Sequence, residues 1–209
     1  MKIGQPSASR AGKTGRPLSF NRHLALEQAM LVFWRHGYET TSIIDLTAAM
    51  GISTPSLYGA FGDKRRLFLE AMQLYAGNRD AMADAIDAAP TARDAARDML
   101  EGAVVGYTGE TTPKGCLLAS ATASGSAASS DVQRAVADIR SFFMERLRHR
   151  IARDVSAGVL PGTTDAHALA GLVITMMQGL SVLARDGIGR ASLRAIAITA
   201  LQAWPRDAG

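Results

Sequence analysis

The sequence contains very little cysteine: Cys116 is the single cysteine among 209 residues. One cysteine excludes an internal disulfide, so a reducing, cytoplasmic setting is expected. A structural zinc site needs four ligands, and this cysteine and the four histidines do not supply them at any recognised spacing. The sequence therefore predicts no metal and no cofactor.

Long hydrophobic runs are also missing. The first 22 residues hold no apolar segment of the kind that a secretory signal requires. The longest apolar stretch, Leu169–Ala184, has sixteen residues and includes Gln178 and Ser181. A bilayer span takes about 20 residues, so we expect a buried helix at a packing interface and no membrane partner.

Sequence motifs of catalysis are absent as well. The chain has no recognisable Ser/His/Asp set, paired-carboxylate motif, phosphate-binding P-loop or GxGxxG fingerprint. The glycine-containing run near Gly125 lacks the preceding strand that a nucleotide-binding loop needs. We therefore expect that the protein is not an enzyme.

No stretch alternates between apolar and polar residues as a strand would, whereas apolar residues recur at helical spacing throughout. The pattern predicts an all-α protein of about nine helices. One of them is expected to run without interruption from Asp63 to Pro90, because an apolar stripe continues from Leu67 to Ile86. Such a helix would connect an N-terminal unit mechanically to the rest of the chain.

The excess of positive charge is confined to the N-terminal third. Residues 1–75 carry nine basic and five acidic side chains, and the remaining residues carry equal numbers of each. Five bases, including Arg10, Lys13 and Arg16, precede Leu24 with no acidic residue among them. This asymmetry favours a head that binds a polyanion; a solvated, disordered tail would also account for it.

Two short helices joined by a tight turn are predicted within this basic third. Thr41 and Ser42 are capping residues before one apolar stripe, and Ser53 precedes a second, with Gly51 in the turn between them. Leu57 and Phe61 give the second helix a buried face, and Thr54 and Ser56 face elsewhere. This is the helix-turn-helix layout, in which one helix enters the DNA major groove.

Residues 37–68, GYETTSIIDLTAAMGISTPSLYGAFGDKRRLF, resemble the DNA-binding domain of TetR-family transcriptional regulators, and the similarity extends from about Phe20 to Tyr75. The shared landmarks are Gly37-Tyr38, Thr41-Ser42, Gly51-Ile52-Ser53, Leu57-Tyr58, Phe61, Asp63-Lys64 and Leu67-Phe68. The chain departs from the family pattern at Gly59-Ala60, where many members carry His or Tyr after Leu-Tyr.

The resemblance implies a set of DNA contacts. Thr41 and Ser42 would offer a helix N-terminus to a phosphate, and Thr54 and Ser56 would read bases. The full set of expected DNA-binding residues is Thr41, Ser42, Ser53, Thr54, Pro55, Ser56, Tyr58 and Lys64. Ser53 and Thr41 could instead be plain helix caps, and Tyr58 a packed aromatic.

The resemblance also implies a C-terminal helical domain that binds an effector and dimerises through its last two helices. The expected interface residues are Leu169, Val173, Met176, Leu180, Leu193, Ile196, Leu201 and Trp204, and the expected pocket residues are Met99, Tyr107, Cys116, Phe142, Met144 and Met177. The interface helices could instead simply wrap the core, and each expected pocket residue could be an ordinary core residue. Cys116 could be a thiol sensor, with Lys114 lowering its pKa, or an inert small hydrophobe.

These expectations combine into one organisation: a flexible basic arm at 1–18, a helix-turn-helix domain at 19–75, and an effector-binding and dimerisation domain at 76–209. The expected function is that of a ligand-responsive repressor, which binds a palindromic operator in double-stranded DNA as a homodimer and is released by a small-molecule effector. The alternative is a non-specific architectural DNA-binding protein.

Overall fold

The computed structural model describes residues 20–120 and 130–205. Within these ranges the chain forms helices and no strand, so the all-α prediction is confirmed. The predicted basic arm, and most of the small-residue run around Gly125, lie outside the described residues. The helices are α1 (Arg22–His36), α2 (Ile43–Met50), α3 (Thr54–Phe61), α4 (Lys64–Ala76), α5 (Arg79–Ala88), α6 (Ala92–Tyr107), α7 (Leu117–Ser120), α8 (Ser130–Ser156), α9 (Ala166–Arg185) and α10 (Arg190–Leu201).

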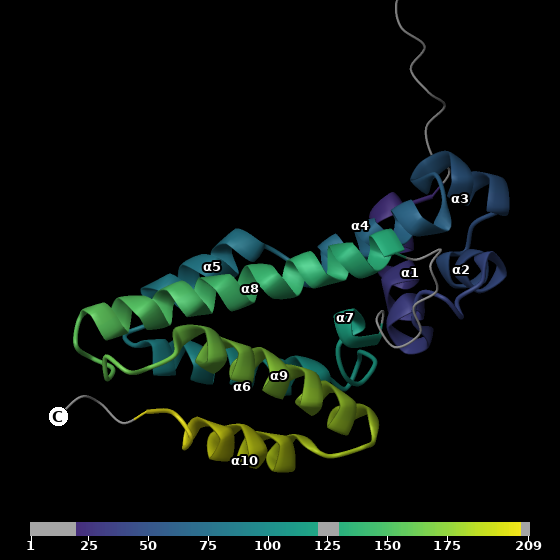
Figure 1. The fold of residues 1–209 in the computed structure, drawn as a ribbon. Coiled ribbons are helices and arrows are strands. Elements are labelled where there is room, and N and C mark those ends of the chain that lie inside the picture. Colours follow the sequence, from purple (N-terminus) through teal and green to yellow (C-terminus); the bar gives the residue numbers. More distant parts are fainter. Residues whose placement is uncertain (1–19, 121–129, 206–209) are drawn as a thin grey trace, which may run out of the picture.

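Helices α1 to α4 form an N-terminal head (Figure 1). Polar side chains begin each helix by accepting hydrogen bonds from first-turn N–H groups: Asn21, Ser42, Ser53 and Asp63 do so for the four helices in turn. The apolar faces of these helices meet in one core that includes the side chains of Phe33, Leu46, Leu57, Leu67 and Phe68.

The predicted continuous helix from Asp63 to Pro90 is wrong. Helix α4 ends at Ala76, because Gly77 takes a φ of 62° that breaks the helical hydrogen-bond pattern. The side chain of Asn78 then accepts a hydrogen bond from the backbone N–H of Ala81 and begins α5. The apolar stripe continues across this break, and this continuity is why periodicity alone predicted one helix.

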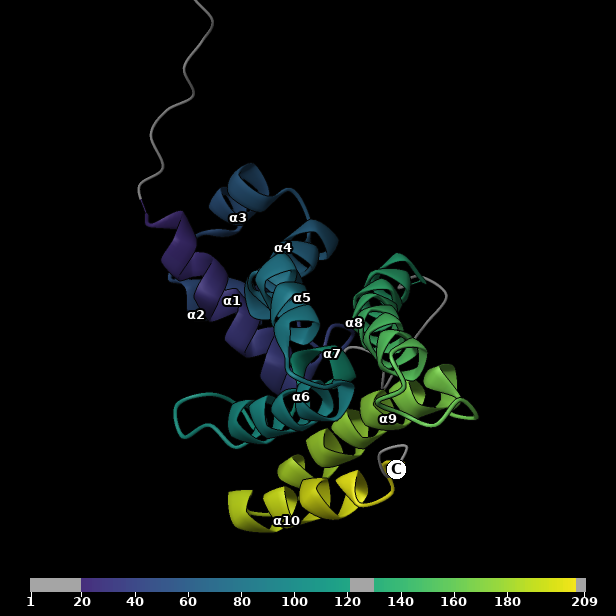
Figure 2. The same cartoon turned by 90° about the vertical axis from the view of Figure 1, so that its left-hand side faces the viewer.

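Helices α5 to α10 form the body, in which the 27-residue α8 runs along one side and α9 lies between α8 and α10 (Figures 1 and 2). The N-terminal part of α8 reaches the head, where Val132 and Val136 join the head's core. An ion pair between Arg65 of α4 and Asp131 of α8 adds a polar link between head and body.

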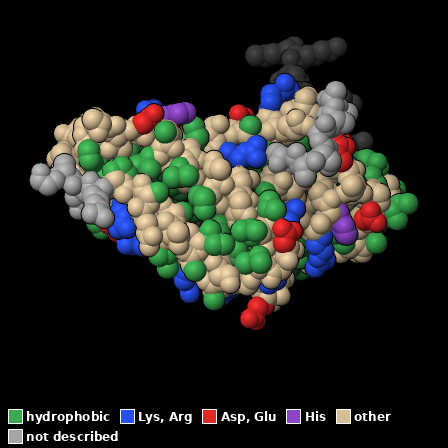
Figure 3. Space-filling view, turned by 60° about the horizontal axis from the view of Figure 1, so that its bottom comes forward, with side chains coloured by type: hydrophobic (Ala, Val, Ile, Leu, Met, Phe, Trp, Pro, Cys, Tyr) green, Lys and Arg blue, Asp and Glu red, His purple; other side chains and the backbone are tan. Residues whose placement is uncertain are grey.

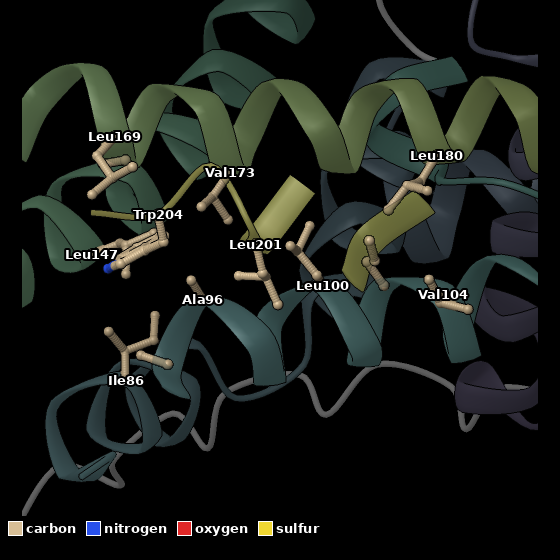
Figure 4. Packing of buried hydrophobic residues seen from close by; sticks show 14 of the residues in the cluster. Ile86, Ala96, Leu100, Val104, Leu147, Leu169, Val173, Leu180, Leu201 and Trp204 are labelled. Atoms are coloured by element: carbon tan, nitrogen blue, oxygen red, sulfur yellow. The ribbon is translucent and has the colours of Figure 1, made fainter. Parts of the chain in front are cut away.

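The core of the body is built from the facing sides of α6, α8, α9 and α10. Figure 4 shows Leu169, Val173 and Leu180 of α9 pointing toward α6, and Trp204 lying beside Leu147 of α8. The long α9 is apolar enough over its 20 residues to meet the length and composition criteria of a membrane span. It packs against α6, α8 and α10 and contributes Leu169, Val173 and Leu180 to the core of the body.

Candidate nucleic-acid interface and internal cavity

Helices α2 and α3 pack at a fixed angle through a short turn. Gly51 adopts the left-handed conformation, with φ 66° and ψ 31°, and its N–H donates to the carbonyl of Thr47. Leu46 of α2 and Leu57 of α3 are completely buried against the head's core. The turn and the two buried leucines therefore hold α3 on the surface of the head, with its opposite face open to solvent.

The open face of α3 is polar and small. Ser53, Thr54 and Pro55 are exposed, and the Tyr58 side chain is 48% exposed. The Ser53 hydroxyl accepts the N–H of Ser56 and lies 2.9 Å from the Ser56 hydroxyl. Capping thus uses part of the hydrogen-bonding capacity of both serines. Thr54 and Tyr58 are the hydroxyl-bearing residues on this helix that face solvent most directly.

The N-terminus of α2 is already occupied by a carboxylate. Asp45 accepts hydrogen bonds from both the N–H and the hydroxyl of Ser42, which in turn accepts the N–H of Asp45. These hydrogen bonds hold the pKa of Asp45 below its usual value. Thr41 is buried and its hydroxyl donates to the carbonyl of Gly37, 2.6 Å away. A phosphate at this helix end would therefore meet the Asp45 carboxylate, and the hydroxyl of Thr41 does not face solvent.

Lys64, the first residue of α4, is held against the head. Its Nζ donates to the carbonyl of Glu39 at 3.2 Å and lies 4.7 Å from the centre of the Tyr38 ring. Partial burial lowers the pKa of Lys64, and the nearby Glu39 opposes that change. The cation thus has a defined position beside the helix-turn-helix.

A cavity of about 490 Å³ lies where the head meets the body. Its walls come from α5, α6, α8 and α9 of the body and from the C-terminal ends of α1 and α4 of the head. Gly102 and Gly106 of α6 are exposed members of the lining, and a Cβ atom at either position would meet no neighbour within 4 Å. The lining is mostly apolar, as in cavities that bind small organic molecules.

The segment around Cys116 joins the cavity to the head. The N–H of Cys116 donates to the Ser181 hydroxyl at 2.8 Å, and its carbonyl accepts from Arg185 at 3.0 Å. Next to it, the carbonyl of Gly115 accepts a hydrogen bond from the indole of Trp34 on α1. Lys114 points elsewhere, since its Nζ donates to the carbonyls of Thr108 and Gly109.

Four of the six expected pocket residues line this cavity: Met99, Tyr107, Cys116 and Met177. Phe142 and Met144 are not part of the lining. Phe142 lies instead beside the guanidinium groups of Arg79 and Arg146, and its neighbour Phe143 faces the cavity. Adjacent residues on a helix point about 100° apart, and the sequence pattern chose the wrong phenylalanine of the pair.

Comparisons with known proteins agree with this geometry. Residues 25–71 match the model of the bacterial regulatory proteins of the tetR family, and residues 93–198 match that of the tetracyclin repressor-like C-terminal domain. The HTH-type transcriptional repressor ComR of Escherichia coli is 31% identical over 193 residues, which cover 91% of this chain and 92% of ComR. The chain belongs to the TetR family.

Solved structures of TetR-family proteins are similar along nearly the whole chain. A cysteine mutant of the regulator CifR, complexed with 26-bp double-strand operator DNA, is 40% identical, with a TM-score of 0.85 over 91% of this chain and all of that one. A TetR regulator from Rhodococcus sp. RHA1 is also 40% identical, with a TM-score of 0.61 over 87% of this chain and 98% of that one. The TetR-family protein is thus a DNA-binding transcriptional regulator, and the architectural alternative is not favoured.

The expected interface residues of this TetR-family chain lie mainly on the inner faces of α9 and α10. Six of the eight are buried in the chain's own core, namely Leu169, Val173, Leu180, Leu193, Leu201 and Trp204, and Met176 and Ile196 are partly buried. The outer faces of the same helices expose Leu172, Val182 and Ile198. The periodicity of the sequence identified two apolar helices. It did not distinguish the side of each helix that packs into the core from the side that is exposed.

Two aromatic cavity residues of the TetR-family protein come from the head and were not expected. Trp34 of α1 and Tyr75 of α4 both line the cavity. Their rings meet edge to face, 4.8 Å apart. In the sequence both residues are ordinary members of apolar stripes, and nothing in the spacing indicates that these stripes extend past the head's core.

Proposed function

We propose that the protein is a ligand-responsive repressor, which binds a palindromic operator as a homodimer and releases it when a small-molecule effector enters the cavity. The observation that carries this proposal is the shared wall of the cavity. Trp34 and Tyr75 belong to helices that carry the helix-turn-helix, so a molecule filling the cavity contacts the head directly. For the effector to lower the affinity for the operator, it must bind the DNA-bound and the released conformations of the protein with different affinities.

For the operator contacts, we propose that α3 enters the major groove. Thr54 and Tyr58 are its most accessible hydroxyls, with Ser53, Pro55 and Ser56 next to them. Lys64 would supply a fixed positive charge to the DNA backbone. The relative ComR is named a transcriptional repressor and the CifR structure contains operator DNA, which supports repression through operator binding.

For the dimer, we propose that the outer faces of α9 and α10 meet their symmetry mates in a four-helix interface. Figure 3 looks onto the α10 side of the molecule, where hydrophobic side chains gather between charged ones. In the single chain, Leu172 and Val182 of α9 and Ile198 of α10 are exposed. Small residues between them, Gly179 among others, would let two helices approach closely.

We propose a division of the chain that follows from its role as a repressor. Residues 19–75 would act as the DNA-binding domain and residues 76–209 as the effector-binding and dimerisation domain, with the basic arm at 1–18 adding charge near the DNA. We propose a cytoplasmic regulator without catalytic activity, because TetR-family proteins act as transcriptional regulators.

Selection of bound sequences from a randomised DNA pool, at about 150 mM salt, tests operator binding. Enrichment of an inverted repeat is the expected result. Binding without enrichment that vanishes as salt rises would contradict the proposal.

A second experiment tests the effector. With the selected operator in hand, a thermal-shift screen of apolar compounds would supply effectors, and Gly102→Leu would serve as the variant with a filled cavity. That variant should bind the operator normally and no longer respond to effector.

A further inference from the structure

Two tyrosines and the cysteine line the same cavity, and one of the tyrosine hydroxyls is bonded to the cysteine sulfur. The hydroxyl of Tyr75, from α4, donates to the Cys116 Sγ at 3.4 Å. Tyr107, at the end of α6, lies near the same cysteine, since Cys116 is one of the groups that raise the pKa of Tyr107 after the larger effect of burial. All three residues line the cavity, and the tyrosines come from the head and the body respectively.

A thiol sulfur is a poor partner for a hydroxyl donor. Sulfur is a weak hydrogen-bond acceptor, whereas a carbonyl or ether oxygen is a strong one. Burial is the main reason that the pKa of both tyrosines is raised, so both hydroxyls keep their protons and act as donors at physiological pH. Tyr75 therefore donates to a weaker acceptor than the oxygen of a bound molecule would be.

The rest of the lining limits the kind of molecule that could supply this acceptor. Met82, Ile86, Met99 and Phe143 are among the apolar side chains that surround the space. The two charged residues of the lining, Asp98 and Arg140, have opposite signs and so favour no net charge on a ligand. A neutral molecule with a largely apolar body fits these walls.

We infer that the effector is a neutral, largely apolar molecule whose acceptor oxygen, of the carbonyl or ether type, takes a hydrogen bond from Tyr75, in place of the Cys116 sulfur, and a second one from Tyr107. This inference rests on the proposed role of the cavity as the effector site. It also names the route to the head: when the Tyr75 hydroxyl turns to the ligand, its ring shifts against Trp34 of α1, which it contacts edge to face.

A matched pair of probes tests the inference. Acetophenone and α-methylstyrene have the same shape and differ by a carbonyl oxygen in place of a methylene group. Their dissociation constants are measured by calorimetry for the wild-type protein and for the Y75F/Y107F double variant, with the two single variants as further samples. The phenylalanines keep the cavity's volume and remove only the hydroxyl groups.

The expected result is a change in preference. Loss of two hydrogen bonds should weaken acetophenone binding by about tenfold or more relative to α-methylstyrene in the double variant, and each single variant should show part of this change. C116S should also weaken acetophenone selectively, because a serine hydroxyl competes better for the tyrosines. Thermal melting of each variant checks that it is folded.

Two results would overturn the inference, and they are distinguishable. If both probes bind and the double variant leaves their ratio unchanged, the tyrosines do not recognise an oxygen, while the cavity stands as a ligand site. If neither probe binds the wild-type protein, the cavity does not accept small neutral aromatics, and the effector role falls together with the inference.

Discussion

The indole Nε1 of Trp34 donates a hydrogen bond to the carbonyl oxygen of Gly115, 3.1 Å away and 81 residues further along the chain. Trp34 belongs to the head and Gly115 to the segment that carries Cys116. The hydroxyl of Ser120 donates back to the carbonyl of Trp34 and to that of Cys116. Head and cavity are therefore joined by buried hydrogen bonds as well as by apolar contacts.

Trp34→Phe should lower the free energy of unfolding by about 1–3 kcal/mol through the unpaired Gly115 carbonyl, in addition to the loss of ring volume. It should also weaken the response to effector, measured as the ratio of the operator dissociation constant with effector to that without it. Urea unfolding and fluorescence anisotropy measure the two effects. Trp204→Phe is the matched control, because Trp204 is equally buried but its Nε1 has no partner in the described structure. Equal losses in the two variants would sink the idea that this hydrogen bond matters.

Gly115→Ala should destabilise the protein by more than about 1 kcal/mol. Gly115 has a φ of 80°, and a Cβ there would lie 2.8 Å from the carbonyl oxygen of Ser181 and 2.6 Å from Nε of Arg185. Gly102→Ala is the opposite case, since it lies in α6 with open space around it. That change should stabilise the protein by roughly 0.5–1 kcal/mol. Thermal unfolding of the two variants should thus shift in opposite directions.

Thr54→Val should weaken binding to the selected operator several-fold while leaving the slope of affinity against salt unchanged, since it removes one exposed hydroxyl and no charge. Lys64→Gln should instead weaken binding to all DNA sequences and reduce the salt slope by about one. Anisotropy titrations at several salt concentrations separate the two effects. The same salt slope in both variants would contradict the placement of Lys64 at a phosphate.

Ile198→Glu should convert the dimer to a monomer with little effect on the fold, because Ile198 is 55% exposed in the single chain. Sedimentation velocity measures the mass, and circular dichroism checks the helical content. Ile44→Glu is the control: Ile44 is also an exposed isoleucine, but it lies on α2, far from α9 and α10. A dimer that survives Ile198→Glu would place the interface elsewhere.

Asp45→Asn should lower stability at neutral pH and have less effect in acid. The pKa of Asp45 is depressed in the folded protein by its bonds to Ser42. Its stabilising contribution is therefore present above the unfolded pKa of about 3.9 and is lost as the pH falls through the folded value. Urea unfolding of both proteins from pH 7 to pH 3 should show their stabilities converging at the acid end. A constant difference would mean that the carboxylate's charge is not what stabilises the α2 N-terminus.

The sequence predicted the helix caps and the turn of the helix-turn-helix because these signals are local. Ser42, Gly51 and Ser53 act through neighbours three or four residues away, so their roles follow from spacing alone. The residues that line the cavity could not be predicted in this way, because they are brought together by long-range packing. Trp34 and Tyr75 reach it from helices whose stripes already have a core to fill, and which faces of α9 and α10 point inward is decided by the other helices.

The break at Gly77 changes what binding in the cavity can accomplish. Because α4 and α5 are separate helices, a molecule that presses only on α5 and the body need not disturb the head. Inducers and silent occupants of the same cavity should therefore both exist. Compounds that reach Trp34 and Tyr75 would release the operator, and compounds that stop short of them would block induction, as antagonists do at a receptor.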